Sequence, residues 1–370
     1  MNPIRTVLVS GCSIAGPCLA YWLREHGFVP TIVERSPVPR PGGQAIDVRG
    51  KALGVLERMG LLDSARALRT TLKGVSVQDG DGNETWRSEE MTFSGGRFDA
   101  NDVEILRDDL AAILVKAANG VEILYGDSIS AISEKPNGIE IEFRSAKDTR
   151  RFDLLVGADG VHSNVRRLAF GDERPFLRET GTGIAVFTIP NSLGLSDWQI
   201  VHREGESGYA VYTARENREL RIAFGFPATL DDESQGNLDA QKMFVASRMA
   251  AFRWEVPRFL REMKNSPDFY FGAAAQVKLN HWSNGRVVLT GDAAYCPSPL
   301  SGQGTSLALV GGYILAAELA KHPSDYSAAF GNYEARMRPY VALNQALIDV
   351  PTGDPTKSQR MKEAKDAISL

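Results

Sequence analysis

The sequence predicts an α/β protein in which a parallel-sheet domain carries an inserted antiparallel sheet and ends in helices. Two stretches predict the parallel sheet, because each runs from an apolar strand through a glycine-rich turn into a helix: residues 6–26 and 286–306. The region 175–280 predicts the antiparallel sheet, because it holds short strand candidates with aromatic residues at 184–189, 208–213 and 220–226.

The first stretch has the order of a Rossmann-like βαβ unit. A β-branched strand, Thr6–Ser10, leads into Gly11-Cys-Ser-Ile-Ala-Gly16, and a helical pattern follows as far as His26. The next strand candidate ends in Glu34, which stands 18 residues after Gly16, near the spacing of about 20 typical of a ribose-binding carboxylate. Ser13 replaces the middle glycine of the usual fingerprint, and its hydroxyl could itself meet a phosphate. The unit predicts dinucleotide binding.

The second stretch places a carboxylate at a strand end and backbone N–H groups at the start of a helix. The strand ends at Gly291-Asp292, and the helix opens near Gly304 after a turn rich in proline and glycine. A helix N-terminus attracts anionic or electron-rich groups. Capping by Asp292 and a purely structural glycine turn are the simpler alternatives.

Bulk properties exclude several classes of protein. The 370 residues are 43% hydrophobic and 24% charged with a net charge of −4, so we expect a globular protein without a nucleic-acid partner. No apolar run is long enough to span a bilayer, and the N-terminus leads directly into a strand, which leaves no room for a signal peptide. The three cysteines form no C-x-x-C pair and no metal spacing. We expect a cytoplasmic monomer without a metal site.

The chain divides into discontinuous domains. We expect a nucleotide domain at 1–72, 98–174 and 281–340, a substrate domain at 73–97 and 175–280, and a C-terminal helical segment at 341–370. Spacing predicts helices over 106–118, 244–263 and 358–366, and paired strands over 121–143.

Three separated motifs carry a resemblance to a known family. They are Gly11–Gly16 with Glu34, the Asp159-Gly160 segment within 153–166, and Gly291-Asp292 with 297–304. Together they resemble the class A flavoprotein monooxygenases of the aromatic-hydroxylase fold. Within that family, the stretches 42–50, 103–110 and 291–304 are most similar to the tetracycline destructases. The chain departs from the family at Ser13 and at Thr305-Ser306, where an asparagine is usual.

The resemblance implies the chemistry. It implies an FAD cofactor, NADPH or NADH as a transient reductant, O2, and a polycyclic or phenolic substrate, with tetracycline-type antibiotics as the first candidates. A flavin C4a-hydroperoxide would be the reactive group, so no catalytic side chain is assigned. Three alternatives stay open: an aromatic polyketide or small-phenol hydroxylase, a flavin- and ligand-binding protein without oxygenase turnover, and an FAD-linked oxidase or dehydrogenase.

The motifs and the resemblance together predict the site residues. The expected cofactor ligands are Gly11, Ser13, Ile14, Ala15, Gly16, Glu34, Arg35, Gln44, Arg49, Arg107, Asp159, Gly160, Asp292, Pro299, Gly302, Gln303, Gly304 and Thr305. Exposed ion pairs would also explain the two arginines Arg49 and Arg107, and a turn would explain Asp159. Strand aromatics that could line the substrate cavity, or pack in the core instead, are Phe187, Tyr212, Phe224 and Phe226.

Overall fold

A computed structural model gives the fold of residues 4–40, 42–92, 96–97, 101–145, 149–234, 237–351, 354 and 356–370. Its first sheet has six strands, in the order β19 (Ser283–Asn284), β20 (Val287–Leu289), β13 (Leu154–Gly157), β1 (Thr6–Ser10), β2 (Val29–Glu34) and β9 (Glu122–Tyr125). All neighbours are parallel except the β19–β20 pair. The central strands are fully buried apolar runs, as a sheet covered on both faces requires.

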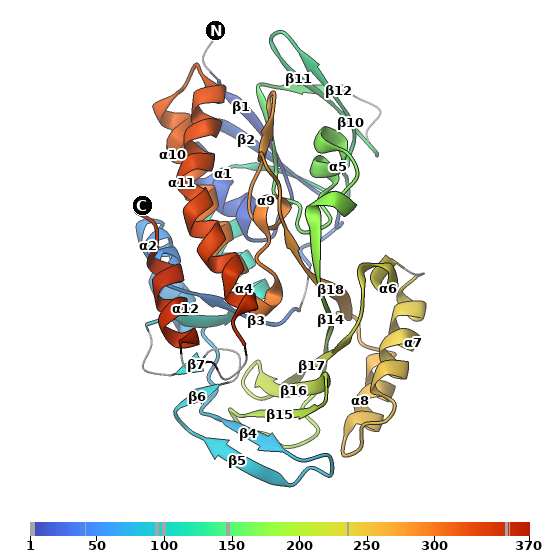
Figure 1. Cartoon of the computed structure of the whole chain (residues 1–370). Coiled ribbons are helices and arrows are strands. Elements are labelled where there is room, and N and C mark those ends of the chain that lie inside the picture. Colours follow the sequence, from blue (N-terminus) through green and yellow to red (C-terminus); the bar gives the residue numbers. More distant parts are fainter. Residues whose placement is uncertain are drawn as a thin grey trace.

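Helices and a small sheet cover the two faces of this parallel sheet (Figure 1). One face carries α1 (Ala15–Glu25), α4 (Arg107–Ala117), α10 (Gly304–Lys321) and α11 (Tyr326–Ala346). The other carries α5 (Asn164–Phe170) and an antiparallel sheet of β10 (Ile129–Lys135), β11 (Gly138–Phe143) and β12 (Thr149–Phe152).

The second large sheet has seven strands. Their order is β18 (Tyr270–Val277), β14 (Leu177–Pro190), β17 (Glu219–Pro227), β16 (Ser207–Ala214), β15 (Gln199–Glu204), β4 (Val75–Gln78) and β5 (Glu84–Ser88). Only the β15–β4 pair is parallel. One face packs against α6 (Leu230–Ser234), α7 (Leu238–Met249) and α8 (Val256–Met263), which enclose a separate hydrophobic core. The fold class predicted from the sequence is confirmed.

Short elements connect the two sheets. They are β3 (Ala45–Val48) paired with β8 (Val103–Leu106), β6 (Met91–Thr92) paired with β7 (Gly96–Arg97), α2 (Lys51–Arg58), α3 (Leu62–Ala67), α9 (Asp292–Tyr295), α12 (Lys357–Asp366) and 3-10 turns at Arg174–Phe176, Pro299–Ser301 and Leu347–Asp349.

One local prediction is wrong. The single helix expected over 244–263 is the pair α7 and α8, because the chain between them turns at Trp254, whose φ is +50° and whose ring stacks on Tyr209. The paired strands predicted over 121–143 are confirmed in β10 and β11, which form an antiparallel hairpin. The preceding strand, β9, lies apart from that hairpin. It pairs in parallel with β2, since that position completes the edge of the first sheet.

Candidate functional site

The glycine-rich loop after β1 is closely packed. A Cβ at Gly11, whose φ is +107°, would lie 2.4 Å from the carbonyl oxygen of Ala158. A Cβ at Gly16 would lie 1.9 Å from the carbonyl oxygen of Gly11. Both positions therefore exclude any side chain, and the loop can approach a ligand with bare backbone.

Glu34 holds this loop from the end of β2. Its Oε2 accepts a hydrogen bond from the backbone N–H of Cys12 at 2.8 Å, and its Oε1 accepts one from Ser36 at 2.9 Å. Each carboxylate oxygen has a second lone pair, so Glu34 retains acceptor capacity for a ribose hydroxyl. It lies at the wall of the main cleft, as do Ser13, Ile14, Ala15 and Arg35.

Asp159 follows β13 and fixes the second loop of the site. Its carboxylate accepts from the Ser163 hydroxyl, from the Val165 backbone at 3.1 Å and from the Ser10 hydroxyl at 3.4 Å. Burial raises the pKa of Asp159, and these hydrogen bonds oppose that rise. The carboxylate thus ties the end of β1 to the start of α5, which leaves Gly160 at the cleft.

Arg166 joins the second loop to the third. Its side chain is fully buried, and it donates to the carbonyl oxygen of Ala293 at 3.0 Å, to that of Val161 and to the carboxylate of Glu173 at 3.2 Å. A buried cation with this many acceptors sets the spacing between the segments that it bridges.

The third loop places Asp292 and the start of α10 at the same cleft. Asp292 begins α9, and burial raises the pKa of its carboxyl. The turn then passes through Ser298 at a φ of +75° and reaches Gly304, where the 18-residue helix α10 begins. Of the third-loop residues predicted to bind the cofactor, the wall of the cleft includes Asp292, Pro299, Gly302, Gly304 and Thr305.

The three loops and the second sheet enclose one cleft of about 2130 Å³. Of the remaining predicted ligands, Gly11, Gln44, Arg49 and Arg107 also line it. Two predicted ligands do not. Gly16 is buried in the first turn of α1, and Gln303 is fully buried with its amide against the sulfur of Met361. A cleft of this size exceeds the 300–1,000 Å³ typical of sites for one drug-sized ligand.

The four predicted substrate residues fall on different faces of the second sheet. Tyr212 lines the cleft, and its hydroxyl accepts a hydrogen bond from the Ala45 backbone at 2.8 Å. Three phenylalanines do not line it, because alternation along β14 and β17 turns them into the core beneath the helices: Phe187, Phe224 and Phe226. Core packing, the simpler alternative, accounts for these three.

Apart from Tyr212, the residues that β14, β16 and β17 present to the cleft are small or aliphatic, and sequence reasoning missed them. They are Ile184, Val186, Ala210 and Ala223. The alternation of side chains along each strand could have identified them. They stand at odd-numbered spacings from the buried aromatic residues of the same strands, and therefore point to the opposite face of the sheet.

Sequence reasoning also missed Asp47, which lies in β3 at the wall of the cleft. Its Oδ2 pairs with the guanidinium of Arg49 at 2.8 Å, and the Arg49 backbone donates to the Ser306 hydroxyl at 3.0 Å. Burial raises the pKa of Asp47 to about 7, although Arg49 opposes the rise. The stretch 42–50 carried part of the family resemblance, but its spacing alone gave this carboxylate no role.

The raised pKa of Asp47 predicts a pH dependence of stability. The unfolded carboxyl titrates near 4, so between about pH 4 and 7 the native state binds the additional proton. The free energy of unfolding should therefore fall as pH rises through that window, by at most about 4 kcal/mol, and then level off. Urea unfolding of the apoprotein from pH 4.5 to 8 should show a flatter profile in Asp47→Asn. The exposed Asp63→Asn is the matched control, and equal slopes in all three proteins would refute the assignment.

The C-terminal helix α12 forms another wall of the cleft. Lys365 pairs with both oxygens of Asp102 at 2.9 Å, and the amide of Asn344 donates to the carbonyl oxygen of Ala364 at 3.0 Å. From α12, Lys357, Ser358, Met361 and Lys362 also border the cleft. The polar helix predicted over 358–366 therefore exists and lies at the site.

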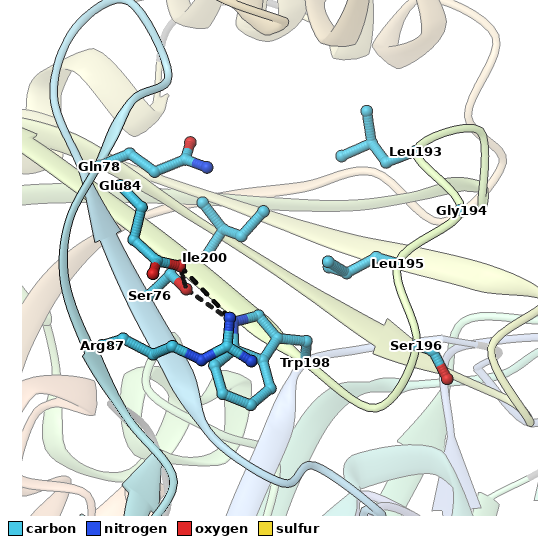
Figure 2. A pocket seen from close by; sticks show the side chains of 10 residues that line it. All are labelled: Ser76, Gln78, Glu84, Arg87, Leu193, Gly194, Leu195, Ser196, Trp198 and Ile200. Carbon is cyan, nitrogen blue, oxygen red and sulfur yellow. Dashed lines mark hydrogen bonds and ion pairs between the residues drawn. The ribbon is translucent and has the colours of Figure 1, made fainter.

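A second, smaller pocket of about 320 Å³ lies at the outer edge of the seven-stranded sheet (Figure 2). There the guanidinium of Arg87 stacks 3.9 Å above the ring of Trp198, whose Nε1 donates to the Ser76 hydroxyl at 2.8 Å. None of the motif residues lines this pocket, so the chemistry belongs to the cleft.

Among the described residues, no group of His, Cys, Asp and Glu could hold a metal ion. Within the same ranges, no helix is both long and apolar enough to cross a membrane.

Comparison with known proteins identifies the family. The profile of the FAD binding domain family matches residues 5–342, so the chain belongs to this family. An uncharacterized protein of Mycobacterium tuberculosis is 46% identical over 369 residues, which is 99% of both chains. A flavin-dependent monooxygenase from an unknown prokaryotic organism is 38% identical, over 100% of this chain and 99% of its own. The crystal structure of tetracycline destructase Tet(51) matches with a TM-score of 0.89 and 33% identity, over 100% and 99%.

Fold, site and relatives together define a flavin-dependent monooxygenase, as the sequence predicted. The site fits FAD on its own geometry. Gly11 leaves bare backbone where a dinucleotide would lie, Gly16 lets α1 pack closely against that loop, and the cleft has room for a cofactor and a second molecule. The start of α10 adds the partial positive charge that suits an electron-rich ring edge.

Proposed function

We propose that this monooxygenase consumes NADPH or NADH and inserts one oxygen atom from O2 into a polycyclic or phenolic substrate, with tetracycline-type antibiotics as the first candidates. The observation that carries the proposal is the cleft of about 2130 Å³, in which the cofactor loops face an open, aliphatic sheet surface. The likeness to a tetracycline destructase over the whole chain supports the substrate class.

The residues of this chain would divide the work as follows. Gly11, Ser13 and Glu34 would hold the adenosine and phosphate end of FAD, and Asp292 the ribityl region. The backbone at the start of α10 would stabilise negative charge on the reduced ring. FAD supplies the oxygen-activating chemistry when bound.

The second sheet and α12 would hold the substrate. The aliphatic face of β14, β16 and β17 offers a flat apolar surface to fused rings, and it excludes water from the reacting region. Tyr212 gives that surface a polar group. Its hydroxyl already accepts from Ala45, and it retains a proton to donate.

The proposal also covers the cellular compartment, the oligomeric state and the binding partners of the protein. We propose a cytoplasmic monomer that has no nucleic-acid partner. The three cysteines support a reducing compartment, since all are free thiols. The net charge of −4 disfavours nucleic acid.

The test is oxygenation of tetracycline by purified, FAD-loaded protein. We expect the drug to stimulate NADPH oxidation, and mass spectrometry to find a product heavier by one oxygen atom that derives from labelled O2. A Gly16→Ala preparation without bound FAD is the control. Stimulation by small phenols but not by tetracycline would reassign the substrate. Peroxide without an oxygenated product would indicate an oxidase, and FAD and drug binding without NADPH consumption would indicate a binding protein.

A further inference from the structure

The turn between β16 and β17 has an unusual backbone. Arg215, Glu216 and Asn217 have φ angles of +53°, +57° and +63°, a conformation that L residues other than glycine adopt at a cost. Neighbouring loops hold the turn in place. The Asn217 side chain accepts from the Asp197 backbone at 2.8 Å, and the Asn191 amide donates to the Asn217 carbonyl oxygen at 2.7 Å. Such strain persists only where surrounding contacts maintain it.

The strained turn projects Arg215 onto the first turn of α4, in the cofactor domain. Its guanidinium binds both carboxylate oxygens of Asp109, at 2.7 and 2.6 Å, and Oδ2 of Asp108 at 2.8 Å. The side chains of Arg215, Asp108 and Asp109 are 18–31% exposed, so solvent screens these ion pairs only in part. One cation thus joins the seven-stranded sheet, which we call the substrate sheet, to two adjacent carboxylates that would otherwise repel each other.

From Asp108 the contacts continue through Gly42 and Arg107 to Ser13, in the glycine-rich loop after β1. The backbone N–H of Gly42 donates to Oδ2 of Asp108 at 3.1 Å, and Arg107 donates to the carbonyl oxygen of Gly42 at 2.8 Å. The other guanidinium nitrogen of Arg107 reaches the Ser13 hydroxyl at 3.4 Å. A Cβ at Gly43 would lie 2.6 Å from Nε of Arg107, which shows how closely this loop encloses the side chain.

We propose that Arg215 is a positioning residue that sets Arg107 against the dinucleotide loop and so couples the substrate sheet to FAD binding. Arg215 itself does not line the cleft, whereas Arg107 and Ser13 do. Loss of Arg215 leaves Asp108 and Asp109 facing each other without a cation, which loosens the bond from Asp108 to Gly42 and frees Arg107. The inference rests on FAD binding in this cleft, and it does not depend on which substrate is oxidised.

The test is a double-mutant cycle on the FAD dissociation constant, measured by flavin fluorescence without substrate. We expect Arg215→Ala to weaken FAD binding about tenfold and to shift the visible flavin spectrum. In the Arg107→Ala background the same change should have no further effect, because Arg215 acts through Arg107. Arg215→Lys should recover part of the affinity, since it restores one ion pair.

Arg253→Ala is the matched control, because Arg253 forms an exposed ion pair with Asp81 at 2.8 Å within the substrate region. It should leave FAD affinity unchanged. An unchanged dissociation constant in Arg215→Ala, or an effect that persists undiminished in the Arg107→Ala background, would overturn the proposal. If Arg215→Ala does not fold, Asp109→Asn carries the same test. Absence of tetracycline turnover would refute only the proposed substrate, since every readout of the cycle is made without substrate.

Discussion

Gly16→Ala should yield a colourless protein. The new Cβ would lie 1.9 Å from the carbonyl oxygen of Gly11, far inside any real contact distance, so α1 and the loop after β1 must separate. Because we expect this loop to contact the pyrophosphate through bare backbone, we expect FAD affinity to fall at least a hundredfold, which is ~3 kcal/mol. The ratio of flavin to protein absorbance after gel filtration measures the loss.

Gly331→Ala provides the comparison for that result. Gly331 lies in α11, and a Cβ there meets nothing within 4 Å, so alanine should be neutral or stabilise the helix by up to about 1 kcal/mol. If Gly16→Ala retained FAD as this control does, the glycine-rich loop would not be the phosphate site.

Phe224→Ala should lower the free energy of unfolding by about 3–5 kcal/mol, since it empties a fully enclosed position. The ring of Phe224 packs edge-on against Phe187, with centroids 5.4 Å apart, in the core beneath α7 and α8. Urea unfolding of the FAD-loaded protein measures the change.

Ala223, the neighbour of Phe224 in β17, faces the cleft. Ala223→Leu should therefore alter stability by less than about 1 kcal/mol while it impairs substrate oxidation by filling the sheet surface.

Phe224→Ala and Ala223→Leu together test the assignment of the two faces of β17, one to the core and the other to the cleft. A Phe224→Ala protein of undiminished stability would place that ring at the substrate surface after all. An Ala223→Leu protein with unchanged turnover would exclude the cleft face of β17 from substrate binding.

Local sequence patterns predicted those parts of the fold that a single contiguous segment specifies. The run Thr6–Ser10, the glycines that follow and the acid at position 34 specify a βαβ unit, because strand pattern, turn chemistry and helix pattern agree over about 30 residues. The start of α10 at Gly304 was likewise evident from the turn before it. The resemblance supplied the cofactor, which no pattern of spacing could name.

Long-range pairing and the choice of sheet face were not predictable in this way. Phe187 and Tyr212 are both strand aromatics, yet one is core and the other faces the cleft, because the face depends on register against strands distant in the chain. Arg215 and Asp109 are 106 residues apart, and no local pattern relates them. The pKa of Asp47 is raised chiefly by burial and further by the nearby carboxylates of Glu104 and Asp102, and a sequence displays neither cause.

The arrangement of β1, β13 and β20 has a consequence for biosynthesis. These strands lie side by side, yet Leu155 pairs with Val287, so the central layer cannot be completed before the ribosome has passed residue 289. A nascent chain that ends before Val287 would have two of the three cofactor loops, and its parallel sheet would lack β20. Flavin should therefore be acquired only after this segment has been synthesised, and its cellular supply would influence how many molecules escape chaperones and proteolysis.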